Sequence, residues 1–368
     1  MIAPATAVPA PIAALVAERG LPTMRQESWR FTNPAPIAAV GFGPSARASM
    51  EIRGTEALPA AAVLPELLRR LEADSIFAAA NAALTPGAQL LRLSGDVAQP
   101  ITITHHNDAA VAYPRLVIDI AAGARVRIIE RFTGQGSYHS VLALTVAQGA
   151  QLEYVRVHQE GGQAVHCAAL TAEIAAGATT AIHQFALGGR LLRTDMHAAL
   201  AGESSEATFN ALMLADADRL VDVHSTLEHR APQCRSRQLY KSLLNDRSRA
   251  VFRGRIHVHS MAQQTDAVQS SRSLLLSDEA IINANPELEI YADDVKCTHG
   301  ATIGALDEAS LFYLRSRGIP VVEARRMLVA AFAAEMLDAV ADATMRAQLE
   351  ALVSARIADV VARAQAVI

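Results

Sequence analysis

Cysteine and aromatic residues are scarce in this sequence. Among 368 residues there are three cysteines, Cys167, Cys234 and Cys297, and no two of them form a Cys-x-x-Cys pair. So few thiols exclude a disulfide-stapled domain and a zinc ribbon. Aromatic residues make up 4% of the chain, whereas hydrophobic residues as a whole make up 51%. The apolar side chains are therefore mostly Ala, Val, Leu and Ile, which favours regular stacked layers.

Charge is also low. The chain has 33 Lys and Arg against 37 Asp and Glu, and its formal net charge is −4. Without a basic field, the composition argues against binding to nucleic acid. No run of about 18 uninterrupted apolar residues occurs, and the first residues have no positively charged segment, so we expect neither a membrane span nor an export signal. With so few cysteines, we expect the protein in a reducing cytoplasm.

The motifs of common catalytic and nucleotide-binding sites are missing. There is no Walker A sequence, no Gly-x-Ser-x-Gly and no His-Glu-x-x-His. The only dinucleotide-like match, Gly41-x-Gly43, is followed by Pro44 and not by an amphipathic helical pattern. The sequence therefore gives no support to P-loop ATP hydrolysis or to conventional hydrolase chemistry.

The hydrophobic pattern divides the chain into three regions. In residues 1–89, apolar residues recur at helical spacing from Pro59 to Ala83, and Thr85-Pro86-Gly87 ends that pattern. In residues 90–305 the pattern changes to short runs of alternating apolar and polar residues, which are typical of strands. Residues 306–368 are helical again, and Asp307 is placed to cap the first helix there. We expect these last helices to cap an open end of the strand region or to dock a partner.

A turn of small residues recurs in the strand region. Its glycines stand at positions 123, 149, 177 and 202, at intervals of 26, 28 and 25 residues. A period of this size in a strand-rich segment predicts a solenoid, and a parallel β-helix fits because only neighbouring coils can cover its apolar inner face. A leucine-rich repeat has the same period but needs a signature that is absent. A β-sandwich is the remaining alternative, and its Asn-Gly and Asp-Gly hairpin turns are missing.

The strongest candidate site is the segment Val295-Lys296-Cys297-Thr298-His299-Gly300. If it is a strand, Cys297 and His299 lie on the same face and present a thiol beside an imidazole. Such a pair suits iron, zinc or an iron–sulfur species, but two ligands do not complete a tetrahedral site. The other ligands must come from another chain, from the sulfides of a cluster or from distant residues.

Other cysteines and histidines are weaker candidates. We interpret Cys167 and Cys234 as structural, and we expect Cys234 to be exposed because charged residues flank it. Eleven of the twelve histidines lie between residues 105 and 259, and on a solenoid we expect them to be solvated on the outer surface. His257 and His259 share a face, but neighbouring arginines oppose a cation there.

Several segments resemble the SufB/SufD family of the Suf system for iron–sulfur cluster assembly. The resemblance is carried by residues 286–304 and 311–319, with support from Glu27 to Thr32, and it spans roughly residues 25–340. It implies a right-handed parallel β-helix with helical ends, in agreement with the repeat. It also implies a cytoplasmic, non-catalytic scaffold that pairs with a SufB-like subunit and binds one copy of the ATPase SufC through its C-terminal helices.

The resemblance also assigns roles to the candidate site. His299 matches the family histidine at the interface between subunits, near the nascent iron–sulfur cluster, and Cys297 is the accompanying cysteine. The family has two paralogous members, and one of them is longer and richer in cysteine. This short chain, with three cysteines, resembles the other member more. Three alternatives stay open: the SufB-type paralogue, a homodimeric interaction module, and a β-helix enzyme that acts on carbohydrate.

Overall fold

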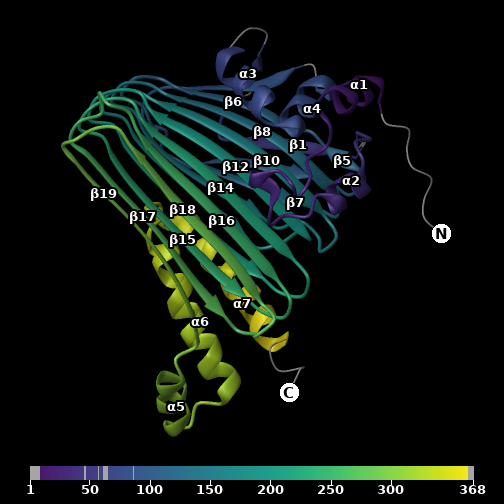
Figure 1. Cartoon of the computed structure of the whole chain (residues 1–368), viewed down its shortest axis with the longest axis vertical. Coiled ribbons are helices and arrows are strands. Elements are labelled where there is room, and N and C mark those ends of the chain that lie inside the picture. The colour runs from purple at the N-terminus through teal and green to yellow at the C-terminus, as the bar shows by residue number, and fades with distance from the viewer. Residues whose placement is uncertain (1–8, 45–46, 57, 61–64, 86, 364–368) are drawn as a thin grey trace.

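The protein is a stack of flattened coils with helices at both ends of the chain. The computed structural model describes residues 9–44, 47–56, 58–60, 65–85 and 87–363. Two long sheets face each other, and the chain passes from one to the other as it winds (Figure 1). The prediction of a mainly β chain folded as a parallel β-helix with helical ends is confirmed.

The two sheets contain nine and ten strands, and successive coils add their strands to both sheets in the same direction. The nine-stranded sheet consists, in order, of β1 (Ser49–Arg53), β4 (Ile101–His106), β7 (Arg125–Thr133), β9 (Gln151–His158), β11 (Thr179–Ala186), β13 (Glu206–Ala215), β15 (Arg235–Leu244), β17 (Thr265–Leu275) and β19 (Val295–Ala305). The ten-stranded sheet consists of β2 (Leu58–Ala60), β3 (Ala88–Leu93), β6 (Arg115–Ile120), β8 (Ser137–Val146), β10 (Val165–Ile174), β12 (Leu191–Leu200), β14 (Leu220–His229), β16 (Arg249–Val258) and β18 (Ile281–Ile290), while β5 (Val111–Ala112) pairs with β8. Pairing is parallel except at β1 with β4 and at β2 with β3.

Equivalent positions of successive coils stack in columns. One column in the nine-stranded sheet runs through positions 128, 154, 182, 209, 238 and 269, so that each coil takes 26 to 31 residues. Its first members, among them Ile128, Tyr154 and Phe209, are fully buried between the sheets. Apolar side chains of the ten-stranded sheet, such as Leu144 and Leu227, meet them from the other side. This shared interior holds the coils together because no coil buries its apolar face alone.

The recurring turn has a structural reason, and one of its predicted members is wrong. Gly123, Gly149 and Gly177 have φ between 63° and 68°, a left-handed conformation that glycine adopts without strain. In the next coil Ser204, with φ 57°, takes this position instead of Gly202. Gly202 lacks a side chain for another reason: a Cβ there would lie 2.0 Å from the amide nitrogen of Ala176. The repeat continues beyond the glycines through other left-handed residues.

The N-terminal helices lie against the outer face of the ten-stranded sheet, whereas β1 and β2 are edge strands of the two sheets. These helices are α1 (Ala10–Arg19), the 3-10 turn η1 (Glu27–Trp29), α2 (Ala35–Val40), α3 (Pro65–Asp74) and α4 (Ile76–Leu84). The helical pattern from Pro59 to Ala83 is confirmed for α3 and α4 and is wrong at its start, where β2 ends. Residues 61–64 lie outside the described residues. The remainder is divided at Ser75, whose hydroxyl caps α4 by accepting a hydrogen bond from the amide of Ala78.

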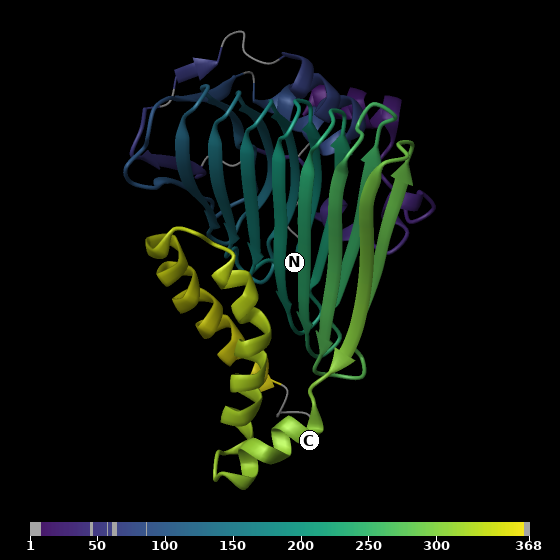
Figure 2. The ribbon, with the colours of Figure 1, turned by 90° about the vertical axis from the view of Figure 1, so that its left-hand side faces the viewer.

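The C-terminal helices are α5 (Glu308–Ser316), α6 (Val321–Asp338) and α7 (Ala343–Arg363). The Asp307 carboxylate caps α5 as the sequence predicts, by accepting from the amides of Ala309 and Ser310. The buried sides of α6 and α7, including Met336 and Leu349, pack against outward residues of the nine-stranded sheet. The expectation that these helices cap the open end of the coil stack is therefore wrong. They cover a side of it, and α5 projects away from the sheets (Figure 2).

Candidate functional site

The last coil leaves both sheets with an unpaired edge. Among the described strands, β19 pairs only with β17, and β18 pairs only with β16. The two strands lie together at one end of the stack (Figure 1). Their burial differs from that of the inner strands, because nearly every residue of β19 is exposed. An open edge of this kind offers unpaired backbone groups and an uncovered interior to another chain.

Cys297 and His299 lie on one face of β19, as the sequence predicts, and that face is the inward one. In the register with β17, Cys297 lies opposite Ala267 and His299 opposite Gln269, both of which are buried between the sheets. Cys297 packs at the edge of a cluster that includes Ile256. His299 is exposed, since no later coil covers it. The structure therefore places the thiol and the imidazole on one face at the mouth of the β-helix.

The two side chains differ in chemical state. Cys297 is half-buried, and burial raises the pKa of its thiol. The thiol is therefore protonated at neutral pH and becomes a ligand when a bound metal displaces the proton. His299 makes no hydrogen bond or ion pair with any residue that the structure describes, so its imidazole is available. One thiol and one imidazole are fewer donors than a tetrahedral metal site needs.

Polar groups continue inward from His299, and sequence reasoning missed them. The column that is apolar in the early coils ends with Gln238, Gln269 and His299. Both amide atoms of Gln269 are buried without a partner among the described residues, as is the hydroxyl of Ser271. Unpaired buried polar groups cost free energy unless they serve a purpose or meet water. Only the register between strands, not the linear sequence, identifies them as neighbours of His299.

Exposed apolar side chains lie on the last coil. Ile290 on β18 is 39% exposed and Ile303 on β19 is 57% exposed. Tyr291, which follows β18 and packs beside His257, is 63% exposed. Large exposed apolar residues that gather on one surface are typical of an interaction site. A second such group lies on the projecting helices: Phe312, Tyr313, Val321, Val322 and Met327. The molecule therefore presents two separate apolar surfaces, one on the last coil and one on α5 with the start of α6.

The expectation of solvated histidines is wrong for six of the eleven. The buried histidines are His105, His139, His158, His166, His183 and His229. Most of them project into the interior, whereas His139 lies beneath the N-terminal helices and His183 lies beneath the C-terminal helices, near Glu153. Cys234 was also expected to be exposed, and it is fully buried, with its sulfur 3.3 Å from the Ser205 hydroxyl.

The outward pair His257 and His259 is confirmed as a same-face pair but is already engaged. The two rings lie 4.4 Å apart. His257 Nδ1 lies 2.8 Å from a Glu289 oxygen, and His259 Nε2 lies 3.4 Å from a Glu228 oxygen. These carboxylates form a ladder of ion pairs across β14, β16 and β18. The pair is therefore part of an outer electrostatic ladder, and no third ligand completes a metal site within the described residues.

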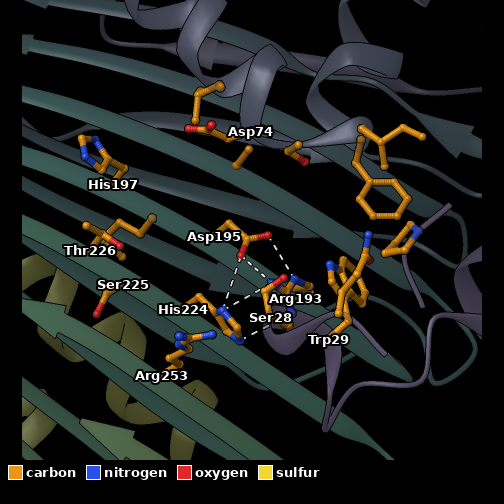
Figure 3. A pocket seen from close by; sticks show the side chains of 18 of the residues that line it. Ser28, Trp29, Asp74, Arg193, Asp195, His197, His224, Ser225, Thr226 and Arg253 are labelled. Atoms are coloured by element: carbon orange, nitrogen blue, oxygen red, sulfur yellow. Dashed lines mark hydrogen bonds and ion pairs between the residues drawn. The ribbon is translucent and has the colours of Figure 1, made fainter. Parts of the chain in front are cut away.

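A pocket of about 540 Å³ lies between the N-terminal segment and the ten-stranded sheet (Figure 3). At its floor the guanidinium of Arg193 stacks on the ring of Trp29, with 4.0 Å to the ring centroid. Arg193 also lies 2.6 Å from an Asp222 oxygen and 2.7 Å from an Asp195 oxygen. Burial alone would lower the pKa of Arg193, but these two carboxylates raise it.

The charges of this pocket fasten the N-terminal segment. Arg193 donates to the carbonyl of Ser28, and Thr32 donates to Asp222. Arg253 donates to Glu27 at 2.9 Å. Carboxylates of the same chain therefore neutralise each of these arginines. The hydrogen bonds and ion pairs fix the segment from Glu27 to Thr32 to the ten-stranded sheet. The arrangement holds the segment in place and leaves no free arginine among these for an anionic ligand.

No helix in the described part of the chain is both long and apolar enough to span a membrane.

Comparison with known proteins gives a consistent family. Residues 102–332 match the model for the SufBD core domain of the SUF system of iron–sulfur cluster assembly. This match covers both sheets from β4 onward, together with α5 and the first part of α6.

Individual relatives agree with the family model. The chain is 36% identical to the iron–sulfur cluster assembly protein SufD of Escherichia coli over 71% of this chain and 64% of that protein, just under two thirds of its length. It is 29% identical to a SufBD family protein of Synechocystis over 91% of this chain and 87% of that protein. It is 34% identical to the chloroplastic protein ABCI7 of Arabidopsis thaliana over 62% of this chain and 49% of that protein. Because the core model matches well over half of its residues, this chain belongs to the SufBD family of iron–sulfur cluster assembly.

Proposed function

We propose that this chain is a non-catalytic scaffold subunit of a Suf iron–sulfur assembly complex. Its strand core, residues 90–305, pairs through β18 and β19 with a SufB-like subunit, or with a second copy of itself. His299 and Cys297 contribute ligands for a nascent cluster or for incoming iron at that seam. The C-terminal region, residues 306–368, binds a SufC-like ATPase, and residues 1–89 form the N-terminal helical region. The complex works in the cytoplasm.

One observation carries this proposal: His299 and Cys297 point inward at the only coil that has no successor among the described strands. A partner strand laid along β19 would extend the sheet and cover both side chains. Interfacial iron would then meet one sulfur and one nitrogen from this chain and further ligands from the other. Thiolate and imidazole ligands suit iron and its clusters, and burial at the seam protects them from water.

Charge and apolar contacts support a partner at the same place. The edge strands carry few charges on their inward sides, and Ile290 and Ile303 are exposed on the same two strands. Covering these side chains removes apolar surface from water, which stabilises association. The iron–sulfur species is cargo here, formed and passed on, and the chain's own part is to hold, orient and enclose it. The family shown is one of cluster assembly, so the carbohydrate-enzyme alternative has no support.

The projecting helix α5 is the surface that best fits the ATPase. Phe312 is 72% exposed and Tyr313 57% exposed, while Leu311 on the same helix is buried against the chain. Deleting the whole region would also strip Met336 and its neighbours from the sheet and destabilise the chain. A double substitution, Phe312→Glu with Tyr313→Glu, removes only the outer contacts. We expect it to abolish co-purification of the SufC-like ATPase while the thermal unfolding of the isolated chain stays unchanged.

The decisive test of the ligand role is cluster build-up in the assembled complex. The chain is co-expressed anaerobically with a SufB-like subunit and a SufC-like ATPase, and iron, sulfide and visible absorbance per complex are measured. With His299→Ala we expect cluster content at least about tenfold lower, as for loss of a metal ligand, and an intact complex. His106→Ala is the matched control, because His106 is an exposed histidine on β4, near the other end of the stack. Full cluster loading with His299→Ala would refute the ligand role.

A further inference from the structure

A second group of ligand-type side chains lies deep inside the β-helix, in coils far from β19. His158 is the last residue of β9, Glu160 follows in the turn, and His166 is near the start of β10. All three are buried, with exposed fractions of 0%, 4% and 2%. The turn brings one residue from each sheet to a common point at the edge of the interior. None of the three has a part in the function proposed above.

The three side chains converge on one point. His158 Nδ1 lies 3.3 Å and His166 Nδ1 lies 2.6 Å from the same Glu160 oxygen, and the two nitrogens are 3.2 Å apart. Ligands of a tetrahedral ion with bonds of 2.0–2.2 Å lie about 3.3 Å from each other. Two of the three separations already have that value, and the third has the length of a hydrogen bond whose proton a metal would replace.

The protein network alone does not satisfy this cluster. If both imidazoles donate from Nδ1 to Glu160, two N–H groups face each other at 3.2 Å. His158 Nε2 is also buried without a partner among the described residues.

Surrounding groups hold the rings in place. The Ser140 hydroxyl lies 2.7 Å from His166 Nε2, so the nitrogen opposite the cluster has a partner that orients the ring. Phe132 stacks on His158 with an interplanar angle of 6°. The neighbouring carboxylate, Glu130, is already paired with Arg156 at 2.7 Å and contributes no charge to the cluster. In the next coil, Gly188 approaches so closely that a Cβ would lie 2.4 Å from the Glu160 carbonyl oxygen.

We propose that His158, Glu160 and His166 form an enclosed binding site for one divalent transition-metal ion, zinc or iron(II). Two imidazoles and one carboxylate are the donor set that both ions accept, and the second Glu160 oxygen or a water completes the coordination. Gly162 and Gln163 in the turn are exposed, so the ion meets its ligands when this turn closes during folding. The site is therefore structural, it joins the two sheets at β9 and β10, and it is independent of the interfacial site at His299.

The test is the metal content of the full chain, expressed alone without an affinity tag in medium supplied with zinc and iron. We expect close to one ion per chain by mass spectrometry, retained in EDTA until the chain is unfolded. Glu160→Gln keeps the shape of the side chain and should reduce the content to a small fraction. His229→Gln is the matched control, since His229 is equally buried in a later coil, and it should keep the ion. Absorption bands after Co²⁺ replacement identify the nitrogen and oxygen ligands.

Two results would overturn this site. One is a folded wild-type chain that holds no metal after refolding with Zn²⁺ or Fe²⁺. The other is an ion that survives Glu160→Gln but is lost with His299→Ala, which would place it at the open end. If Glu160→Gln does not fold, the wild type decides: refolding with Zn²⁺ or Fe²⁺ must raise its unfolding temperature relative to metal-free refolding. An unchanged temperature contradicts the proposal.

Discussion

The interior of the β-helix and its open end treat the same kinds of side chain in opposite ways. At β9 and β10, two histidines and a carboxylate are enclosed and contact one another, so that all the protein groups of the cluster come from this chain. At β19, Cys297 and His299 have the same orientation relative to the sheets but no coil above them. The difference arises from position in the stack and not from local sequence. A polar side chain inside the stack affects folding, whereas one on the last coil is free to affect assembly.

The largest expected effect is on the enclosed region. Arg156 and Glu130 form a buried ion pair, with exposed fractions of 1% and 2%. Glu130→Gln leaves the Arg156 charge uncompensated in the interior, so we expect the free energy of unfolding to fall by about 3–5 kcal/mol. Urea unfolding measures this. Adding Arg156→Met to the same chain should recover part of the loss, and a loss below about 1 kcal/mol for Glu130→Gln would contradict the comparison.

Substitution of an apolar residue at the open end should weaken assembly and leave the free energy of unfolding nearly unchanged. Ile303→Asp should weaken binding of the SufB-like subunit about 10- to 100-fold, because a charge would enter the proposed interface. The unfolding free energy of the isolated chain should change by no more than about 0.5 kcal/mol, since Ile303 is exposed. Met24→Asp is the control, an exposed apolar residue in the N-terminal segment. Equal weakening by both substitutions would count against β19 as the interface.

A smaller effect is expected on the pH dependence of the free energy of unfolding. Burial lowers the pKa of His139 to about 3, and neither of its ring nitrogens has a partner among the described residues. Its neutral form stabilises the fold above the ordinary histidine pKa, and this contribution is lost as the pH falls from about 6.5 toward 3. His139→Phe should therefore reduce the slope of stability against pH by up to about 1.4 kcal/mol per unit between pH 6 and 4.

Phe is suitable at this position because His139 packs among the rings of Phe42, Phe77 and Tyr113. At pH 7.5 the variant should be about as stable as the wild type. The His299→Ala chain, whose substituted residue is exposed and has no partner among the described residues, should keep the wild-type slope. An unchanged slope for His139→Phe would show that this histidine already has a hydrogen-bonding partner or charge in solution.

The sequence was sufficient for the architecture because the repeat is physical. Gly123, Gly149 and Gly177 mark turns that must be left-handed, and their spacing equals the length of a coil. In the later coils the amino-acid sequence no longer shows the repeat, because Ser204 and Gln233 adopt the same left-handed conformation without being glycine. The break at Ser75 and the position of α6 against a sheet face depend on tertiary packing, which linear spacing does not report.

The site was predictable in part for the same reason. Alternation along one strand was enough to put Cys297 and His299 on a common face. It did not reveal that Gln269 lies beside His299, since that depends on a register 30 residues away. Nor did it reveal the cluster of His158 and His166, which lie on different sheets and meet only at a turn. A His-x-Glu spacing followed by a second histidine six residues later was the only signal available.

Isotope labelling gives the most direct test of the claim that this chain supplies a cluster ligand from its last coil. The complex is assembled anaerobically with ¹⁵N-histidine in this chain alone, and the reduced cluster is studied by pulsed electron paramagnetic resonance. The account predicts a ¹⁵N coupling from one histidine, and its disappearance with His299→Ala. A fully occupied cluster with no ¹⁵N coupling from this chain would contradict it.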